Sequence, residues 1–288
     1  MPHSLAFFEP ESVEQAIALL AEHGGDAKVV AGATAITIML RQRLIAPTAL
    51  VSLGRIDGLR EIREDDGMLV LGALVTHREV ERSALVRRRI PILAETFGLV
   101  ANVRVRNVAT VGGVVAEADY ASDPPAALLA LDAEIEARGP DGARRIAAAE
   151  FFRGFYETAL RPDEIVTAVR VPVPPPGTQG AYEKFVTRST EDRPCVGVAT
   201  LVRFDGGRCA DLRVAVGAAA ETPRRYPELE ALGRGTTLRG DVVPTIAAGY
   251  ASATDALDDM RGSAHYRKTI IEVLVRRGIE RAAAAARG

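Results

Sequence analysis

Two glycine-containing turns are the features of this sequence best suited to chemistry, because each could receive a phosphate-bearing ligand. The first is Ala31-Gly32-Ala33-Thr34-Ala35, between an expected strand and an expected helix. Backbone N–H groups in such a turn point outward, and the dipole of the following helix adds partial positive charge. Thr34 supplies a further hydroxyl donor. A pyrophosphate could therefore bind here without a basic side chain.

The second turn is Thr110-Val111-Gly112-Gly113-Val114, which is also expected to follow a strand. Paired glycines let the backbone approach a flat or charged ligand closely, since no Cβ intervenes. For each turn the alternative is purely structural, because glycines at the end of a strand usually serve only to reverse the chain. The sequence has no G-x-G-x-x-G motif and no P-loop, so it does not support a Rossmann site or a nucleotide hydrolase.

Few side chains suggest acid–base or metal chemistry. Asp119 and Asp123 are four residues apart and could form an acid–base pair. The simpler interpretation is that Asp123 caps a helix that begins at Pro124. His77 lies between a threonine and an arginine, which favours a surface or hydrogen-bonding role over that of a base. The other histidines are scattered, and no nucleophile elbow is present. We expect neither a catalytic residue nor a metal site on this chain.

Charge and cysteine content narrow the class of protein. Lys and Arg number 36 against 38 Asp and Glu, which gives no electrostatic reason to expect a nucleic acid or membrane surface as partner. Two cysteines, Cys195 and Cys209, are too few for a four-thiolate iron–sulfur or zinc site. Apolar runs such as residues 125–131 are shorter than the roughly 20 residues of a membrane span. The N-terminus lacks a secretory pattern, so we expect a cytoplasmic protein.

The first turn is expected to belong to a β–α–β unit. A first helix begins at a capping box formed by Ser12 and Gln15. A strand at residues 27–31, a helix at 36–43 and a strand at 48–53 follow. The two strands should be parallel if the intervening helix is a crossover.

The next part of the chain mixes strands and helices. Asp65-Asp66-Gly67 predicts a hairpin between residues 61–64 and 68–72. The alternation of valine and arginine at residues 103–106 predicts the strand ahead of the second turn. Helices are expected at residues 90–100 and 124–131, and a further strand at 133–137.

A proline-rich stretch, residues 171–177, marks the clearest boundary and is expected to be an extended connector. Beyond it we expect three strands and then two helices, which together form an α+β lobe. These elements span residues 182–188, 195–204, 208–218, 242–257 and 266–285.

Several segments, taken in order, carry a family resemblance. The first turn, with Met39-Leu40-Arg41 downstream, and the second turn, continuing through Ala121-Ser122-Asp123, resemble two successive FAD motifs. Leu71-Gly72-Ala73, Tyr182-Glu183-Lys184-Phe185 and Val196-Gly197-Val198-Ala199 also fit. The chain thereby resembles the FAD-binding medium subunits of molybdenum hydroxylases, the family of aerobic carbon monoxide dehydrogenase and xanthine dehydrogenase. The resemblance covers essentially the whole chain.

The resemblance implies an α+β fold with an FAD-binding domain of the PCMH type at residues 1–176. Its subdomains would span about 1–54 and 55–176, ahead of a small C-terminal domain at 177–288 with a three-stranded antiparallel sheet and helices. It also implies a set of cofactor-binding residues. These are Lys28, Val30, Ala31, Gly32, Ala33, Thr34, Ala35, Thr110, Val111, Gly112, Gly113, Val114, Asp119, Asp123, Leu160 and Lys184.

The sequence departs from the family pattern at several of these places. Many members have glycine where Ala33 stands and asparagine where Val114 stands. Glu117 replaces a usual histidine, and Tyr120 stands where proline is common. Arg193-Pro194 replaces an aromatic residue expected near the flavin.

The function implied by the resemblance is electron transfer through FAD, from iron–sulfur clusters of a partner subunit to an external acceptor. A small subunit would carry clusters of the 2Fe–2S type and a large subunit would carry molybdopterin, in a dimer of heterotrimers. Two alternatives are a cofactor-free assembly scaffold and a self-sufficient flavin oxidase. The substrate of the complex and the electron acceptor stay open.

Overall fold

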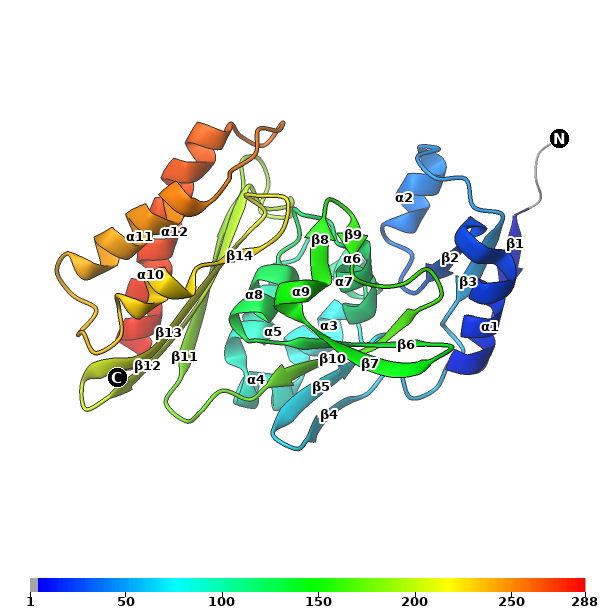
Figure 1. Cartoon of the computed structure of the whole chain (residues 1–288), viewed down its shortest axis with the longest axis horizontal. Coiled ribbons are helices and arrows are strands. Elements are labelled where there is room, and N and C mark those ends of the chain that lie inside the picture. The colour runs from blue at the N-terminus through cyan, green and yellow to red at the C-terminus, as the bar shows by residue number, and fades with distance from the viewer. Residues whose placement is uncertain (1–4, 288) are drawn as a thin grey trace.

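Residues 5–287 are described by the computed structural model, which divides them among three sheets with covering helices and a small two-stranded ribbon (Figure 1). The expected α+β class is confirmed. No helix of the described residues is long and apolar enough to cross a lipid bilayer.

The N-terminal unit is a parallel sheet of order β1-β3-β2, with bounds Ala6–Phe8, Ala49–Ser52 and Ala27–Val30. The expected parallel pairing of β2 and β3 is confirmed. Helix α1 (Val13–His23) packs Val13, Ala16, Ile17 and Leu20 on one face of this sheet. The Ser12 hydroxyl accepts a hydrogen bond from the Gln15 N–H, as expected, whereas the Gln15 side chain accepts from the N–H of Glu11. A short 3-10 turn, Gly24–Asp26, leads into β2.

The middle of the molecule is a five-stranded antiparallel sheet of order β4-β5-β10-β6-β7. The hairpin of β4 (Ile62–Asp65) and β5 (Met68–Gly72) is confirmed, and Asp66 and Gly67 both have positive φ, as a type I′ turn requires. The other strands are β6 (Glu134–Gly139), β7 (Gly142–Ala147) and β10 (Ile165–Pro172). A ribbon of β8 (Phe152–Gly154) and β9 (Glu157–Thr158) lies between β7 and β10 in the chain.

Strand β10 was not foreseen from the sequence, although its Ile-Val-Thr-Ala-Val-Arg-Val run is rich in β-branched residues. It is the central strand of the sheet and ends at Pro172, which pairs with Met68. The expected connector therefore starts only after Pro172. A proline is tolerated there because it is the last residue of the strand.

Short helices cover this sheet on the side of the C-terminal domain. They are α3 (His77–Arg82), α4 (Ala84–Arg89), α5 (Pro91–Gly98), α6 (Val103–Arg106), α7 (Val111–Glu117), α8 (Pro124–Ala130) and α9 (Ala148–Phe151). The strand expected at residues 103–106 is wrong, because these residues form α6. The Asn102 side chain caps that helix by accepting hydrogen bonds from the N–H groups of Arg104 and Val105. An alternation of only four residues does not distinguish a strand from a helical turn that begins at a capping residue.

The C-terminal sheet has the three expected strands, β11 (Gln179–Phe185), β12 (Val196–Asp205) and β13 (Arg208–Gly217), and a short fourth strand, β14 (Arg224–Arg225). Alternate residues of β12 face opposite sides: Ala199 and Leu201 join the central core, while Val198 and Val202 pack toward helices α11 and α12. The helices are α10 (Pro227–Ala231), α11 (Val242–Ala253) and α12 (Ala264–Ala285). The sheet is thus held between α5 and α8 on one side and α11 and α12 on the other (Figure 1).

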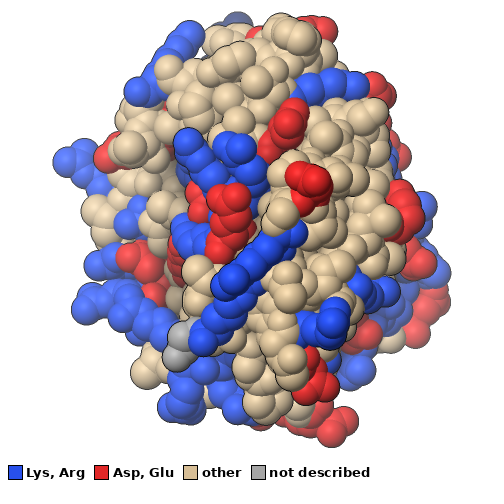
Figure 2. Space-filling model, turned by 90° about the vertical axis from the view of Figure 1, so that its left-hand side faces the viewer, with Lys and Arg blue, Asp and Glu red and all other residues tan. Residues whose placement is uncertain are grey.

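The outer face of the C-terminal domain carries intermixed charges. Figure 2 shows basic and acidic side chains next to one another across this face, with uncharged surface around them. Exposed residues of α12 have both signs, among them Arg276, Arg277 and Glu280.

We predict that Gly217→Ala destabilises the packing of helix α8 on the C-terminal sheet. A Cβ at Gly217 would lie 2.9 Å from the Cβ of Ala126, so the two elements must separate. Overpacking of this kind costs about 1–3 kcal/mol, measurable by urea denaturation. Gly25→Ala is the matched control, because a Cβ there meets nothing within 4 Å. Equal stability of the two variants would contradict the prediction.

Candidate functional site

The first glycine turn, residues 31–35, connects the end of β2 to helix α2 (Ile36–Arg41). The N–H groups of Gly32, Ala33, Thr34 and Ala35 donate no hydrogen bond to any other residue within 5–287. Unsatisfied N–H groups that share one turn are suited to an anion. Helix α2 is six residues long, shorter than expected, so its dipole adds little to this turn.

Ala33 adopts a left-handed conformation, with a φ of 58°. The sequence departs from glycine at this position, and a Cβ in that conformation costs about 1–2 kcal/mol. The residue is held in place because its carbonyl accepts a hydrogen bond from the Thr37 N–H at 3.1 Å. The turn therefore keeps the conformation that glycine would favour.

The first turn lies directly against the segment that leads into the second. A Cβ at Gly32 would lie 1.9 Å from the carbonyl oxygen of Val108 and 3.1 Å from the Cα of Ala109. Only glycine permits this approach of two backbones. The structure thus brings the first turn beside residues 108–110, although the two turns are far apart in sequence.

The second turn differs from the expectation, since Gly112 and Gly113 lie in the first turn of helix α7 rather than after a strand. Its N–H groups are already used: Val111 donates to the Val75 carbonyl, Gly112 to the Ala73 carbonyl and Gly113 to the Thr110 hydroxyl. The N–H groups of residues 111–113 are therefore not free to bind a pyrophosphate, in contrast to those of the first turn. Gly112 instead allows close packing, because a Cβ there would lie 2.6 Å from the Cβ of Ala73.

Asp123 and Lys184 meet at the junction of the FAD-binding and C-terminal parts. The Lys184 ammonium lies 2.9 Å from Asp123 Oδ2 and also donates to the Leu99 carbonyl at 2.8 Å. The Tyr182 hydroxyl donates to Asp123 Oδ1 at 3.0 Å. Both charged side chains are buried. Asp123 occupies the N-cap position of α8 but makes no capping hydrogen bond, so the simple capping interpretation is wrong.

Burial is the main influence on the Asp123 carboxyl and raises its pKa to about 6. The Lys184 ammonium and the Tyr182 hydroxyl act in the opposite direction and favour the ionised form. Burial and the neighbouring carboxylate raise the pKa of Tyr182 well above its ordinary value, so this residue remains a donor.

A second charged group surrounds Asp119. Its Oδ1 accepts from the Ala121 N–H at 3.0 Å and from the Tyr156 hydroxyl at 3.4 Å, and the Arg193 guanidinium lies 2.8 Å from Oδ2 as an ion pair without hydrogen-bond geometry. Nearby, burial raises the pKa of Glu117 to about 7, with a further contribution from Asp119 and an opposing one from Arg193. Glu117 and Arg193, at which the sequence departs from the family pattern, therefore belong to the same group of charged side chains.

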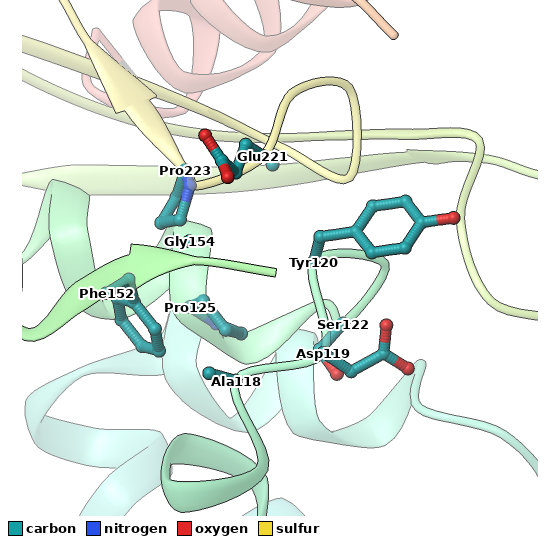
Figure 3. A pocket seen from close by; sticks show the side chains of 10 residues that line it. Ala118, Asp119, Tyr120, Ser122, Pro125, Phe152, Gly154, Glu221 and Pro223 are labelled. Carbon is teal, nitrogen blue, oxygen red and sulfur yellow. The ribbon is translucent and has the colours of Figure 1, made fainter. Parts of the chain in front are cut away.

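A small pocket adjoins this group between the loop at residues 118–125, strand β8 and residues 217–223. Figure 3 shows the side chains of Tyr120 and Asp119 directed to the same side, away from Phe152. The Tyr120 hydroxyl donates to Asp259 Oδ2 at 2.7 Å, which ties this loop to the C-terminal domain. The pocket has about the size of a water molecule and cannot hold a flavin ring.

The other residues expected to bind the cofactor lie in separate elements of the fold. Lys28 is exposed on β2, in register with Leu50. Leu160 follows β9 and packs partly buried against the central core. Val114 is buried in α7. The sequence indicated no role for Tyr156 or for the carbonyl of Val108. It also did not indicate that Tyr182 contacts Asp123 or that Arg193 pairs with Asp119. Only Tyr182 had a usable signal, since it lies two residues from Lys184 on one strand and so faces the same side.

His77 is buried beneath the second turn, and its backbone N–H donates to the Ala109 carbonyl at 2.9 Å. Neither ring nitrogen has a hydrogen-bond partner among residues 5–287, and the ring meets the edge of Phe97. The expected surface position is therefore wrong. Burial lowers the pKa of His77 to about 4. The described residues also contain no group of three or more His, Cys, Asp or Glu side chains placed to hold a metal ion.

We predict that Ala33→Gly stabilises the chain by about 1 kcal/mol, because it removes the strain of a Cβ at positive φ. The control is Ala18→Gly, an exposed position in the middle of helix α1, where glycine should destabilise by about 0.5–1 kcal/mol. Urea denaturation measures both changes. Destabilisation by both substitutions would show that Ala33 is not strained.

We predict that His77 makes the chain sensitive to mild acid. The unfolded chain binds a proton near pH 6.5 and the folded chain near pH 4, so folding stability falls as pH drops through that window. The loss should reach about 3 kcal/mol at pH 4, and His77→Leu should remove it in denaturation curves recorded across the window. The same substitution at exposed His265 controls for the loss of a histidine. An acid response unchanged by His77→Leu would refute the assignment.

Comparisons with known proteins agree over the whole chain. The family model described as the FAD binding domain in molybdopterin dehydrogenase matches residues 3–174, and that of the CO dehydrogenase flavoprotein C-terminal domain matches residues 181–282. The carbon monoxide dehydrogenase medium chain of Afipia carboxidovorans is 35% identical, over 100% of this chain and 99% of that protein. The alpha subunit of the 6-hydroxypseudooxynicotine dehydrogenase complex of Paenarthrobacter nicotinovorans is 33% identical over 98% of this chain and 95% of that protein.

Solved structures give the same result. The structure of Cu,Mo-CO dehydrogenase in its cyanide-inactivated form contains a chain that superposes with a TM-score of 0.95, at 35% identity over 99% of both chains. A chain of quinoline 2-oxidoreductase from Pseudomonas putida superposes with a TM-score of 0.93, at 29% identity over 98% of both. The fold, the two family models and these relatives identify the chain as a member of the family of FAD-binding medium subunits of molybdenum hydroxylases.

Proposed function

We propose that this subunit holds one FAD with its pyrophosphate at residues 31–35 and passes electrons through it, from the iron–sulfur clusters of a partner subunit to an external acceptor. The observation that carries the proposal is the set of free N–H groups at residues 32–35, which lies against the backbone of Val108 and Ala109. A Cβ at Gly32 would collide with the Val108 carbonyl, so glycine is required for the turn to keep this position. The four N–H groups of this turn, which have no acceptor within residues 5–287, fit an anionic pyrophosphate.

When bound, FAD would supply the redox chemistry of electron transfer. The chain's own residues bind and orient it. Gly32, Ala33, Thr34 and Ala35 neutralise the pyrophosphate through their N–H groups, and the Thr34 hydroxyl adds a donor. In the second segment, residues 110–114, Gly113 is the one residue that is not buried, and the flavin would contact the segment there.

The pair of Asp123 and Lys184 closes the site from the C-terminal domain. Lys184 donates two hydrogen bonds, one to Asp123 and one to the Leu99 carbonyl, and an ammonium group has three N–H donors. We assign the third N–H donor of Lys184 to the cofactor. Leu160 would lie at the border of the same site. Lys28, on the exposed side of β2, would contact the same ligand near the first turn. No acid or base is required for electron transfer.

The same proposal implies that this chain assembles with partner subunits. The relatives are described as a medium chain and as a subunit of a dehydrogenase complex. We propose that this chain assembles with an iron–sulfur small subunit and a molybdopterin large subunit in a dimer of heterotrimers. Its two cysteines are buried and unlinked, so cluster ligands would come from a partner. We place the division between its domains at residues 176 and 177.

We predict that the purified chain binds FAD and that Gly32→Ala abolishes binding, because the added Cβ displaces the first turn from Val108. Absorbance after removal of free flavin measures the bound FAD. Ala33→Gly is the control and should bind at least as well as the parent. Circular dichroism checks the fold, and Thr34→Val, which removes one hydroxyl, should weaken binding about tenfold even if Gly32→Ala misfolds.

Two outcomes would contradict this function. A parent chain that is folded and takes up no FAD would favour the cofactor-free scaffold. Turnover of an organic substrate by the isolated flavoprotein would favour the self-sufficient oxidase.

A further inference from the structure

Tyr182 is a fully buried residue of β11 whose hydroxyl reaches across to the FAD-binding part of the chain. Its ring is 2% exposed, and its hydroxyl donates to Asp123 Oδ1 at 3.0 Å. The space for this hydroxyl is provided by Gly197 of the neighbouring strand β12. A Cβ at Gly197 would lie 2.2 Å from the Tyr182 oxygen. Gly197 is therefore required for Tyr182 to reach Asp123.

The polar and charged groups around this contact form three sets. Lys184, on β11, and Tyr182 are the groups that favour the ionised form of Asp123. From α5, Glu95 Oε2 accepts from the Tyr182 N–H at 3.4 Å, and from α12, Arg281 pairs with both Glu95 and Glu183. Asp119, four residues before Asp123, is paired with Arg193 instead. Tyr182 is thus the one uncharged side chain that donates to the Asp123 carboxylate within residues 5–287.

We propose that Tyr182 is a positioning residue for the flavin site: its hydroxyl orients the Asp123 carboxylate toward Lys184 and keeps it ionised, and Gly197 makes room for it. This inference rests on the proposed function. The hydroxyl satisfies one carboxylate oxygen, which leaves the other to Lys184. Without it, a buried oxygen loses its partner and the carboxyl takes up a proton more readily. Lys184 then loses its counter-charge, and the loop at residues 119–123 loses one of its attachments to the C-terminal domain, while those of Tyr120 to Asp259 and of Asp119 to Arg193 remain.

The test compares Tyr182→Phe with the parent chain in two measurements over pH 4 to 9. The first is release of FAD, followed by flavin fluorescence. Binding that needs ionised Asp123 weakens as pH falls through about 6 in the parent, and the midpoint should lie about one pH unit higher in Tyr182→Phe. Tyr226→Phe is the matched control, because its hydroxyl donates to the Ala253 carbonyl, away from Asp123. Its midpoint should equal that of the parent.

The second measurement is the unfolding free energy of the flavin-free chain. Because the folded pKa of Asp123 is raised, the contribution of this carboxyl to the unfolding free energy falls as pH rises from about 4 to about 6. His77 contributes with the opposite sign over the same range, so the quantity compared is the difference between Tyr182→Phe and the parent at each pH. In Tyr182→Phe this fall should extend about one pH unit higher. Gly197→Ala, which displaces the hydroxyl, should give the same displacement if it folds.

An upward displacement in both measurements supports the inference. A Tyr182→Phe variant with the parent's FAD-release midpoint would overturn it, since loss of packing alone lowers affinity without moving a pH midpoint. A parent chain that takes up no FAD would instead overturn the proposed function, and the flavin-free curve alone would then decide whether Tyr182 controls Asp123.

Discussion

One close approach between two backbones governs the geometry of this molecule. Gly32 lies so near the carbonyl of Val108 that no side chain fits between them. The contact joins the small parallel sheet to the helical layer of the central domain, and the N–H groups of residues 32–35 beside it have no acceptor within residues 5–287. N–H groups that share one turn and have no acceptor in the protein favour the binding of an anion. The proposed binding site thus lies where two units pack.

A second constraint holds the other side of the site. The buried pair of Asp123 and Lys184 joins helix α8 to strand β11, and such a pair is stable only when the remaining polar atoms are also satisfied. Here Tyr182 and the Leu99 carbonyl satisfy them. The C-terminal domain therefore does more than cover the flavin domain. It holds the loop that follows helix α7 in place. It thereby also holds Glu117 and Tyr120, two residues at which the sequence departs from the family pattern.

Local signals in the sequence predicted local structure well. Ser12, the Asp66-Gly67 turn and the helix from Pro124 were found because caps and turns depend on neighbouring residues. Residues 103–106 were misassigned because a short alternation does not distinguish a strand from a capped helical turn. The side-chain partners of Asp123 and Asp119 could not be inferred, because they lie 37 or more residues away along the chain. Likewise, only coordinates reveal that the N–H groups of Gly112 and Gly113 are already bonded.

The proposed FAD site depends on the N–H groups of the first turn, and not on those of the second, to hold the pyrophosphate. Hydrogen exchange of individual amides, measured by NMR with and without FAD, tests this assignment. The amides of residues 32–35 should become strongly protected when FAD is added. Amides 111–114, already bonded, should change little. Unchanged exchange at residues 32–35 in a chain saturated with FAD would contradict the assignment.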